Sequence, residues 1–116
     1  MMINRGDLYY ANLGDVNSTS VQNGIRPVLV ISNDKGNKYS PTVIVAPLTS
    51  KIKRADLPIH TILTKDDDNG LELNSVVLLE QLRILDKTQI LYKIGKICKE
   101  DLHNVDNALK ISLNLA

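Results

Sequence analysis

The run Val28-Leu29-Val30-Ile31 consists of β-branched and aliphatic residues and is bounded by Pro27 and by Asn33-Asp34. Two similar runs, Val43-Ile44-Val45-Ala46 and Val76-Val77-Leu78-Leu79, follow farther along the chain. Continuous apolar runs of this length between turn-forming residues predict strands that are buried on both faces. Three such strands in a chain of 116 residues predict a mainly β protein with one core.

Shorter strands are expected around these three runs. Pro41 and Pro47 are predicted to mark the two ends of the second run. The segment Asp66-Asp67-Asp68-Asn69-Gly70 is predicted to be a surface turn, because it lacks the alternating ligands and the distal glutamate of a calcium loop. The number and spacing of the strands predict a small β-barrel, in one domain over residues 1–116. The additional strands are expected at residues 7–12, 59–63, 83–85 and 92–94.

The last segment has a helical pattern instead. Apolar residues recur there at intervals of three or four, at Leu102, Val105, Leu109 and Leu113. This spacing predicts a helix over residues 99–115 with one apolar face. A second ridge on the opposite side is either a half-exposed helix end or a contact with another subunit, and it consists of Ala108, Ile111 and Leu115.

The composition excludes several classes of protein. An apolar content of 43% with 14 Lys and Arg against 13 Asp and Glu is typical of a globular domain, not of a disordered chain. No apolar run approaches the roughly 18 residues of a membrane span, and residues 1–5 lack the layout of a secretory signal. We therefore expect a cytoplasmic protein that does not contact membranes. The single cysteine, Cys98, cannot form an internal disulfide.

Charge is segregated along the chain. Residues 26–54 contain six Lys or Arg and one Asp, whereas residues 55–72 contain five acidic residues and one Lys. These are either two solvated loops or a positive groove for a polyanion beside an acidic turn. Because the whole chain is close to neutral, any nucleic-acid site is expected to be local.

Metal and nucleotide chemistry are not indicated by the sequence. His60 and His103 do not lie in any spacing typical of zinc ligands, and no glycine motif of a phosphate-binding loop is present. We therefore expect no metal site and no cofactor. The aromatic residues are four Tyr, which argues against a surface that stacks several RNA bases.

Three longer motifs lie in order along the chain: RGDLYYA (residues 5–11), GIRPVLVISND (24–34) and SPTVIVAPLT (40–49). They closely resemble the MazF/PemK toxins of type II toxin–antitoxin systems, most of all the Gram-positive branch of that family. The likeness continues through residues 57–58, residues 75–83 and the C-terminal helix, and so covers essentially the whole chain. Because several motifs occur in order at compatible spacing, the resemblance is more specific than any single short pattern.

This resemblance implies an SH3-like barrel, similar to MazF, PemK and CcdB, with a C-terminal helix. It also implies a homodimer that acts as a metal-independent endoribonuclease. The enzyme would cleave single-stranded RNA, in particular messenger RNA, at short specific sequences. A cognate antitoxin would inhibit the enzyme by placing an acidic tail in the RNA groove. Related toxins favour five-base sites resembling U^ACAU, and we expect a similar site here.

Two catalytic residues are implied by the same resemblance. Arg26 in the RPVLVI motif matches the catalytic arginine of the family, and Thr49 matches its catalytic threonine. RNA supplies its own nucleophile, the 2′-hydroxyl, so the enzyme needs charge stabilisation and proton transfer, and the products are a 2′,3′-cyclic phosphate and a 5′-hydroxyl. Arg26 can donate to two phosphate oxygens at once, and Thr49 can donate to the same phosphate.

Each of these residues also has a purely structural alternative. Arg26 would then be a surface arginine paired with Asp34 or Glu80, and the Thr49 hydroxyl would satisfy a turn. An arginine holds its proton too tightly to be a good general base at neutral pH, although the resemblance implies that Arg26 also transfers protons. The sequence leaves the identity of the general base open.

A further group of residues is predicted to bind RNA. Basic side chains directly after Thr49 would follow the phosphate backbone, and they are Lys51, Lys53 and Arg54. Asn33 and Gln81 offer amides that can pair with unstacked bases. His60 either stacks or hydrogen-bonds at the rim of the groove, or is a strand residue whose ring is satisfied within the fold.

The polar segment ahead of Arg26 is predicted to form a loop over the site. Its candidate residues are Thr19, Ser20 and Gln22. Val21 stands where related toxins often have an acidic residue, so an acid–base role in this loop and the preferred RNA motif are both in question.

Two other kinds of function compete with the ribonuclease. One is a non-catalytic toxin on the same barrel, such as a poison of DNA gyrase, and the other is an RNA-binding module without cleavage activity. The presence of both Arg26 and Thr49 favours the ribonuclease.

Overall fold

The computed structural model of the protein describes residues 2–15, 21–52 and 56–115. Seven strands, two α-helices and one short 3₁₀ helix follow one another in this part of the chain. In chain order they are β1 (Asp7–Asn12), β2 (Ile25–Val30), α1 (Asp34–Tyr39), β3 (Thr42–Thr49), β4 (His60–Leu63), β5 (Ser75–Leu78), β6 (Arg83–Asp86), η1 (Lys87–Gln89), β7 (Ile90–Lys96) and α2 (Lys99–Ser112).

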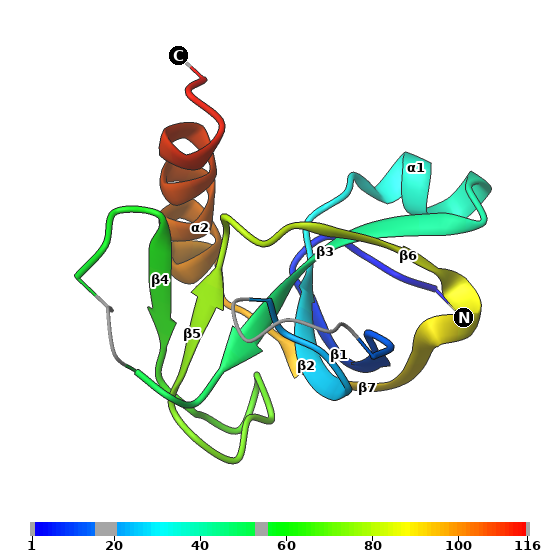
Figure 1. Ribbon diagram of the computed structural model, residues 1–116, viewed down its shortest axis with the longest axis horizontal. Coiled ribbons are helices and arrows are strands. Elements are labelled where there is room, and N and C mark those ends of the chain that lie inside the picture. The colour runs from blue at the N-terminus through cyan, green and yellow to red at the C-terminus, as the bar shows by residue number, and fades with distance from the viewer. Residues whose placement is uncertain (1, 16–20, 53–55, 116) are drawn as a thin grey trace.

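The strands form one curved antiparallel sheet. Its order is β4-β5-β3-β2-β1-β7, and β6 pairs with the first half of β3 beside β5. Among the described residues β4 and β7 end this path without pairing with each other, so the sheet is barrel-like but not closed. Figure 1 shows α2 on the side of β4 and β5, and α1 on the opposite side of the molecule. The prediction of a small, mainly β barrel with a C-terminal helix is confirmed.

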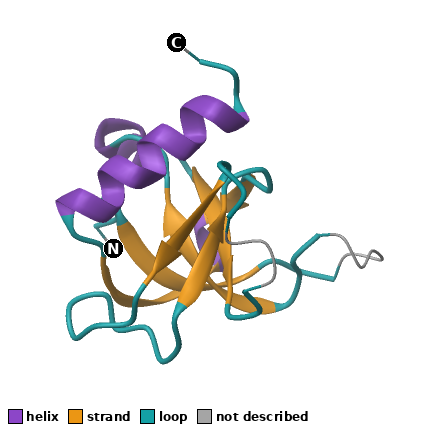
Figure 2. Ribbon diagram, turned by 90° about the vertical axis from the view of Figure 1, so that its left-hand side faces the viewer, coloured by secondary structure: helices purple, strands orange, loops and turns teal. Residues whose placement is uncertain are grey.

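One face of the sheet, the helix face, is covered by α2, which Figure 2 shows lying across the strands. Leu8, Leu29 and Leu48 point to this face and pack with Val105 and Leu109 of the helix. Fully burying a side chain of this kind contributes roughly 1.5–3 kcal/mol. The apolar contacts on the helix face therefore hold α2 against the sheet.

The other face, the far face, is the inside of the curved sheet. It carries the alternate residues of the same strands, and these form a second buried cluster. The cluster includes Tyr9 and Ala11 of β1, Val28 and Val30 of β2, Val43 and Val45 of β3, and Leu85 of β6. A strand that feeds two cores must be apolar at successive positions, which explains the uninterrupted apolar runs.

The second run does not end at Pro47 as predicted, because β3 continues through Pro47 to Thr49. On one side of β3 the last partner in β6 is Arg83, opposite Val45, and the first partner in β5 is Val77, opposite Leu48. Pro47 thus lies where β3 changes partners, and a residue without an N–H is tolerated there. The strand can therefore reach Thr49.

The C-terminal helix begins at Lys99 as predicted but ends at Ser112. Ala108, assigned to the outer ridge, is buried against the sheet, whereas Leu113, assigned to the inner face, is about half exposed. The inner face is wider than the predicted stripe, because Val105, Ala108 and Leu109 are all buried. Ile111 and Leu115 remain exposed, as the prediction of an outer ridge requires. In the described part of the chain no helix is long and apolar enough to cross a bilayer.

The predicted surface turn at residues 66–70 is confirmed and packs closely on β7. A Cβ at Gly95 would lie 2.3 Å from the carbonyl oxygen of Asp68, and one at Gly70 would lie 2.3 Å from that of Ile94. Buried Asn69 holds the turn together by donating to the Thr64 carbonyl at 2.9 Å. Only glycine allows the two backbones to approach this closely.

Candidate active site

Arg26 lies on the far face, one step beyond the apolar cluster. It is opposite Ala11 of β1 and two residues before Val28, so its side chain starts on the same side of the sheet as both of these buried residues. At this position the far face changes from apolar to polar, and Arg26 is only partly buried.

Thr49 lies at the end of β3, next to the same edge of the far face. The β2–β3 ladder ends at the pair Val28–Pro47, and its register continued by two residues sets Arg26 against Thr49. Residues directly opposite in a ladder have Cβ atoms about 5 Å apart. The Thr49 oxygen accepts from the backbone N–H of Lys51 at 3.2 Å, which leaves its own proton to be donated.

The Arg26 guanidinium is held by one nitrogen. Its Nε donates to the carbonyl of Asn23 at 2.9 Å, and within the described residues no partner is found for either terminal nitrogen. The structural alternative of an ion pair is not observed, because the Asp34 carboxylate accepts from the backbone N–H of Arg5 and Glu80 pairs with His60. An arginine fixed through Nε presents two parallel N–H groups to a ligand.

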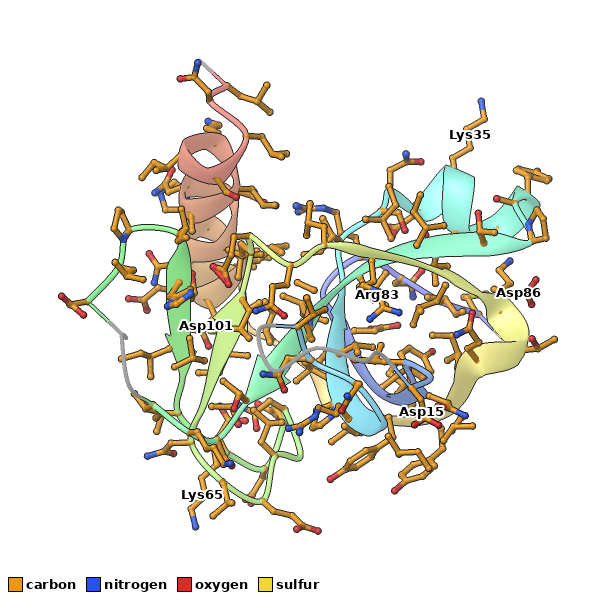
Figure 3. All side chains as sticks on the ribbon, viewed as in Figure 1. Asp15, Lys35, Lys65, Arg83, Asp86 and Asp101 are labelled. Atoms are coloured by element: carbon orange, nitrogen blue, oxygen red, sulfur yellow. The ribbon has the colours of Figure 1, made fainter. Side chains whose placement is uncertain are left out.

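The segment before Arg26 is anchored by two residues that follow β5. The Gln81 Oε1 accepts from the backbone N–H of Gln22 at 3.0 Å. Arg83 donates from Nη2 to the Leu13 carbonyl at 2.9 Å and from Nη1 to the Gln22 carbonyl at 3.3 Å. Figure 3 shows Arg83 directed into the molecule, whereas Lys35 and Lys65 extend outward.

Arg83 is a residue that the sequence analysis did not single out as a candidate. Its position opposite Val45 and two residues before buried Leu85 places it on the far face. The available signal was a charged residue in strand alternation with a buried leucine, which predicts an inward-pointing charge that needs partners.

A cavity of about 170 Å³ adjoins Arg26 and is lined by residues of β1, β2, β3, β5 and β7 and by the segments after β3 and before β5. Ser50 lines it directly after Thr49, and Tyr10 and Glu72 lie in its wall. Burial, then the nearby Glu72 carboxylate and Tyr92, raise the pKa of Tyr10, so this phenol stays neutral and can donate at physiological pH. Among the described residues no three His, Cys, Asp or Glu side chains are grouped as a metal site would require.

His60, on the far face, contacts Glu80. His60 Nε2 lies 2.7 Å from Glu80 Oε2. His60 pairs with Leu78, which lies one strand from Pro47, so His60 and Thr49 point to the same side of the sheet. One strand, β5, lies between them, so the two strands that carry these residues are roughly 10 Å apart. His60 is thus a strand residue whose ring contacts a carboxylate, and both interpretations of it stay predictions.

The structure separates the other predicted RNA-binding residues. Asn33 caps α1 by accepting from the backbone N–H of Gly36 at 2.7 Å, and it follows the end of β2 opposite to Arg26. The structure does not bring Asn33 to Arg26, because the seven-residue step between them along extended chain covers roughly 23 Å. Lys51 is exposed beside Thr49. Four predicted residues lie outside the described part of the chain: Thr19, Ser20, Lys53 and Arg54.

Gln22 carries a buried amide oxygen that has no hydrogen-bond partner in the described part of the chain. A buried acceptor without a donor costs about 1–3 kcal/mol. Together with Asn23, Arg26, Gln81 and Arg83, Gln22 forms a polar cluster, which with Thr49 we call the candidate site. The group resembles a binding surface for a polar anionic ligand, because its charged members are arginines.

Fold and site together define a small barrel-like β protein with a C-terminal helix and a positively charged polar site at one end of the sheet. The model of the PemK-like, MazF-like toxin of type II toxin–antitoxin systems matches residues 4–113. The chain therefore belongs to this toxin family.

Solved structures of the same fold cover nearly the whole chain. MazF from Deinococcus radiodurans superposes with a TM-score of 0.83 at 24% identity, over 99% of both chains. An endoribonuclease from Mycobacterial species, in complex with its cognate antitoxin, has a TM-score of 0.81 at 22% identity, over 98% of this chain and 97% of that chain. The Mycobacterium tuberculosis toxin MazF-mt6 has a TM-score of 0.79 at 20% identity, over 95% of this chain and 98% of that chain.

Proposed function

We propose that the protein is the toxin of a type II toxin–antitoxin system and acts as a metal-independent endoribonuclease on single-stranded RNA. The observation that carries the proposal is the Arg26 guanidinium, which Asn23 holds through Nε while both terminal nitrogens lack a partner among the described residues. Membership of the toxin family and the likeness to solved endoribonucleases support the same activity.

In the proposed reaction the 2′-oxygen of one nucleotide attacks the adjacent phosphorus. The new O2′–P bond replaces the P–O5′ bond, so one product ends in a 2′,3′-cyclic phosphate and the other begins with a 5′-hydroxyl. The 2′-hydroxyl loses its proton and the departing 5′-oxygen gains one. Arg26 donates two hydrogen bonds to the phosphate oxygens, whose negative charge grows in the transition state, and Thr49 donates a third.

RNA is held, in this proposal, by side chains around the same end of the sheet. Lys51, and with it Lys53 and Arg54, contacts the phosphate backbone, so binding weakens as salt concentration rises. Gln22 and Gln81 face unstacked bases through their amides, and a base amino group would satisfy the buried Gln22 oxygen. Asn33 lies at the far end of β2 and would contact only a longer stretch of RNA.

The partners that we propose are a second copy of the chain and a cytoplasmic antitoxin with an acidic segment. Ile44 and Ile84 are opposite each other on β3 and β6 and are both exposed, and Ile111 and Leu115 of the helix end are exposed as well. Such a set of apolar side chains favours contact between copies. An acidic antitoxin segment would bind Arg26 of the candidate site and the exposed Lys51, and would exclude RNA.

The test is to incubate the purified protein with a long single-stranded RNA in EDTA and to map the cleavage ends. Arg26→Ala is the inactive variant, and Arg5→Ala is the matched control, because Arg5 lies at the other end of β2. Discrete cuts with 5′-hydroxyl ends, absent only in Arg26→Ala, are expected. If the folded protein leaves all RNA intact, the proposal of ribonuclease activity is wrong. Binding to RNA or to DNA gyrase then becomes the function to test.

A further inference from the structure

We propose that Arg83 is a positioning residue for this active site, because its guanidinium fixes the carbonyl of Gln22, the residue before Asn23, whose own carbonyl orients Arg26. The inference rests on the proposed ribonuclease function. Arg83 itself is not placed against the scissile phosphate. It acts through the segment that connects β1 to β2.

Arg83 joins the two described ends of that segment. Its Nη2 donates to the carbonyl of Leu13, directly after β1, and its Nη1 donates to the carbonyl of Gln22, shortly before β2. Backbone bonds close the same region, since Leu13 donates to the Gly24 carbonyl at 2.8 Å and Gly24 donates to that of Gly14 at 2.8 Å. Arg83 therefore adds a side-chain bridge to the base of the connection.

The bridge leads directly to Arg26. Gln22, which Arg83 holds, is bonded covalently to Asn23, and the Asn23 carbonyl accepts from Arg26 Nε. Gln81, two residues before Arg83, holds the N–H of Gln22, and Arg83, the first residue of β6, holds its carbonyl. A shift of Gln22 would move the carbonyl that sets the plane of the Arg26 guanidinium.

An arginine suits this position for two physical reasons. Its planar fork reaches two carbonyls at once, whereas a lysine is a point charge that would satisfy them less well. It also stays charged when partly buried, and charge-assisted bonds to carbonyls are the stronger kind. The partial burial of Arg83 and the two backbone partners indicate a structural anchor rather than a phosphate ligand.

Arg5 provides a matched control within the same chain. It is also a partly buried arginine, and it donates from Nε to the carbonyl of Ile31 at 2.8 Å and from Nη2 to Asp106 at 2.6 Å. These contacts join the N-terminal segment to the end of β2 opposite to Arg26 and to α2. Loss of Arg5 should therefore lower stability without disturbing the candidate site.

The experiment compares Arg83→Ala, Arg83→Lys and Arg5→Ala with the wild type, using an RNA oligonucleotide that contains the mapped cleavage site. Thermal melting is measured first, and kcat and KM are then determined at a temperature where every variant is folded. Arg83→Ala should lower kcat at least 10-fold with KM changed less than about threefold, because the interaction that is weakened develops in the transition state. Arg83→Lys should fall between Arg83→Ala and the wild type, and Arg5→Ala should keep the wild-type kcat.

Two further measurements separate positioning from general stability. Guanidinium ion is added at concentrations that leave the melting temperature unchanged. It should restore part of the cleavage rate of Arg83→Ala, whereas the rate of Arg26→Ala should stay at the background level. Hydrogen exchange of the Gln22 amide should be faster in Arg83→Ala and unchanged in Arg5→Ala.

Several results would overturn the inference. A wild-type kcat in folded Arg83→Ala, or equal losses of kcat in Arg83→Ala and Arg5→Ala, would show that Arg83 does not position Arg26. A rise in KM with a smaller salt slope would make Arg83 a phosphate contact instead. If the amide of Gln22 exchanges equally fast in Arg83→Ala and in the wild type, Arg83 does not hold Gln22. If the wild type cleaves no RNA, the proposed function itself fails.

Discussion

The helix face and the far face carry alternate side chains of the same strands, but the arginines of the candidate site lie at the end of the far face. On the helix face Leu8, Leu29 and Leu48 are all covered by α2 or by the loops beside it. On the far face Arg26 lies two residues before Val28 on β2, and Arg83 of β6 pairs with Val45 of β3. Both faces therefore contribute a core, and the polar end of the far face can be altered with little loss of either core.

This comparison predicts that catalysis and stability are separable by face. Substitutions at the polar end of the far face should reduce activity while the protein stays folded. Substitutions on the helix face should reduce stability while each folded molecule keeps its activity. Four changes test this, in order of the expected size of the effect.

The largest effect is expected from Arg26→Ala. Removing a preorganised donor from a developing oxyanion lowers kcat by about 10²–10³-fold. The free energy of unfolding should change by less than about 1 kcal/mol, because the side chain is only partly buried. Cleavage of a mapped oligonucleotide and urea denaturation measure the two quantities. Arg26→Lys should recover only a small part of the rate, and a lysine variant as fast as the wild type would contradict the two-bond role.

The next effect is expected on the helix face from Leu109→Ala. Removing most of a buried leucine costs about 2–3 kcal/mol, at the lower end of the range for such changes, because Leu109 is 8% exposed. Urea denaturation measures the loss, and the rate per folded molecule should be unchanged. Leu113→Ala is the control in the same segment, since Leu113 is 51% exposed and should cost less than about 0.5 kcal/mol. Equal losses at both positions would contradict the observed orientation of α2.

A smaller effect is expected from Thr49→Val, which removes one hydroxyl at nearly constant shape. A hydrogen bond to a charged acceptor contributes about 1.5 kcal/mol at the lower end of its range, so kcat should fall by about 10-fold. Single-turnover cleavage measures this loss, and Thr49→Ser should retain most of the rate. A valine variant with the wild-type rate would leave Thr49 as a turn residue that only accepts from Lys51.

The smallest effect is expected at Asp86, at the opposite end of β6 from Arg83 (Figure 3). Hydrogen bonds from the backbone N–H and then the hydroxyl of Thr88 lower the pKa of the Asp86 carboxyl. A carboxyl whose pKa is lower in the folded state stabilises the fold above its unfolded pKa, and this contribution is lost as the pH falls through the folded pKa. Asp86→Asn should therefore reduce stability slightly at neutral pH and not in strong acid, with no change in RNA cleavage. A difference from wild type that persists in strong acid would show that the charge is not its cause.

Much of the fold follows from the sequence because the strands feed two cores. The apolar runs at residues 28–31, 43–46 and 76–79 located three strands, and the shorter strands predicted around them match the other four. The short helix α1 was not predicted, since DKGNKY contains a glycine and lacks the apolar periodicity of a helix. Pro47 misled the prediction of the end of β3, because a single sequence does not show where a strand changes partners.

The candidate site was predictable only in part. Arg26 and Thr49 were identified through a resemblance, and the register sets them against each other. Asn33 has the right amide for base recognition but uses it to cap α1, because an amide directly before a helix satisfies the free N–H groups there. Arg83 was missed since its partners are the backbone carbonyls of Leu13 and Gln22, and backbone groups leave no trace in residue types.

The pairing of β1 with β7 has a consequence for how the molecule matures. Asp7 pairs with Lys96 in that ladder, so the hydrogen bonds along one edge of β1 can form only after β7 has been synthesised. Contacts between distant parts of a chain form slowly, and a ribosome delivers them in chain order. Every residue of the candidate site is synthesised before β7 and α2, which complete the two cores. We therefore expect a nascent chain to contain the residues of the candidate site before it has the scaffold that positions them, and to become active only after the last helix has docked.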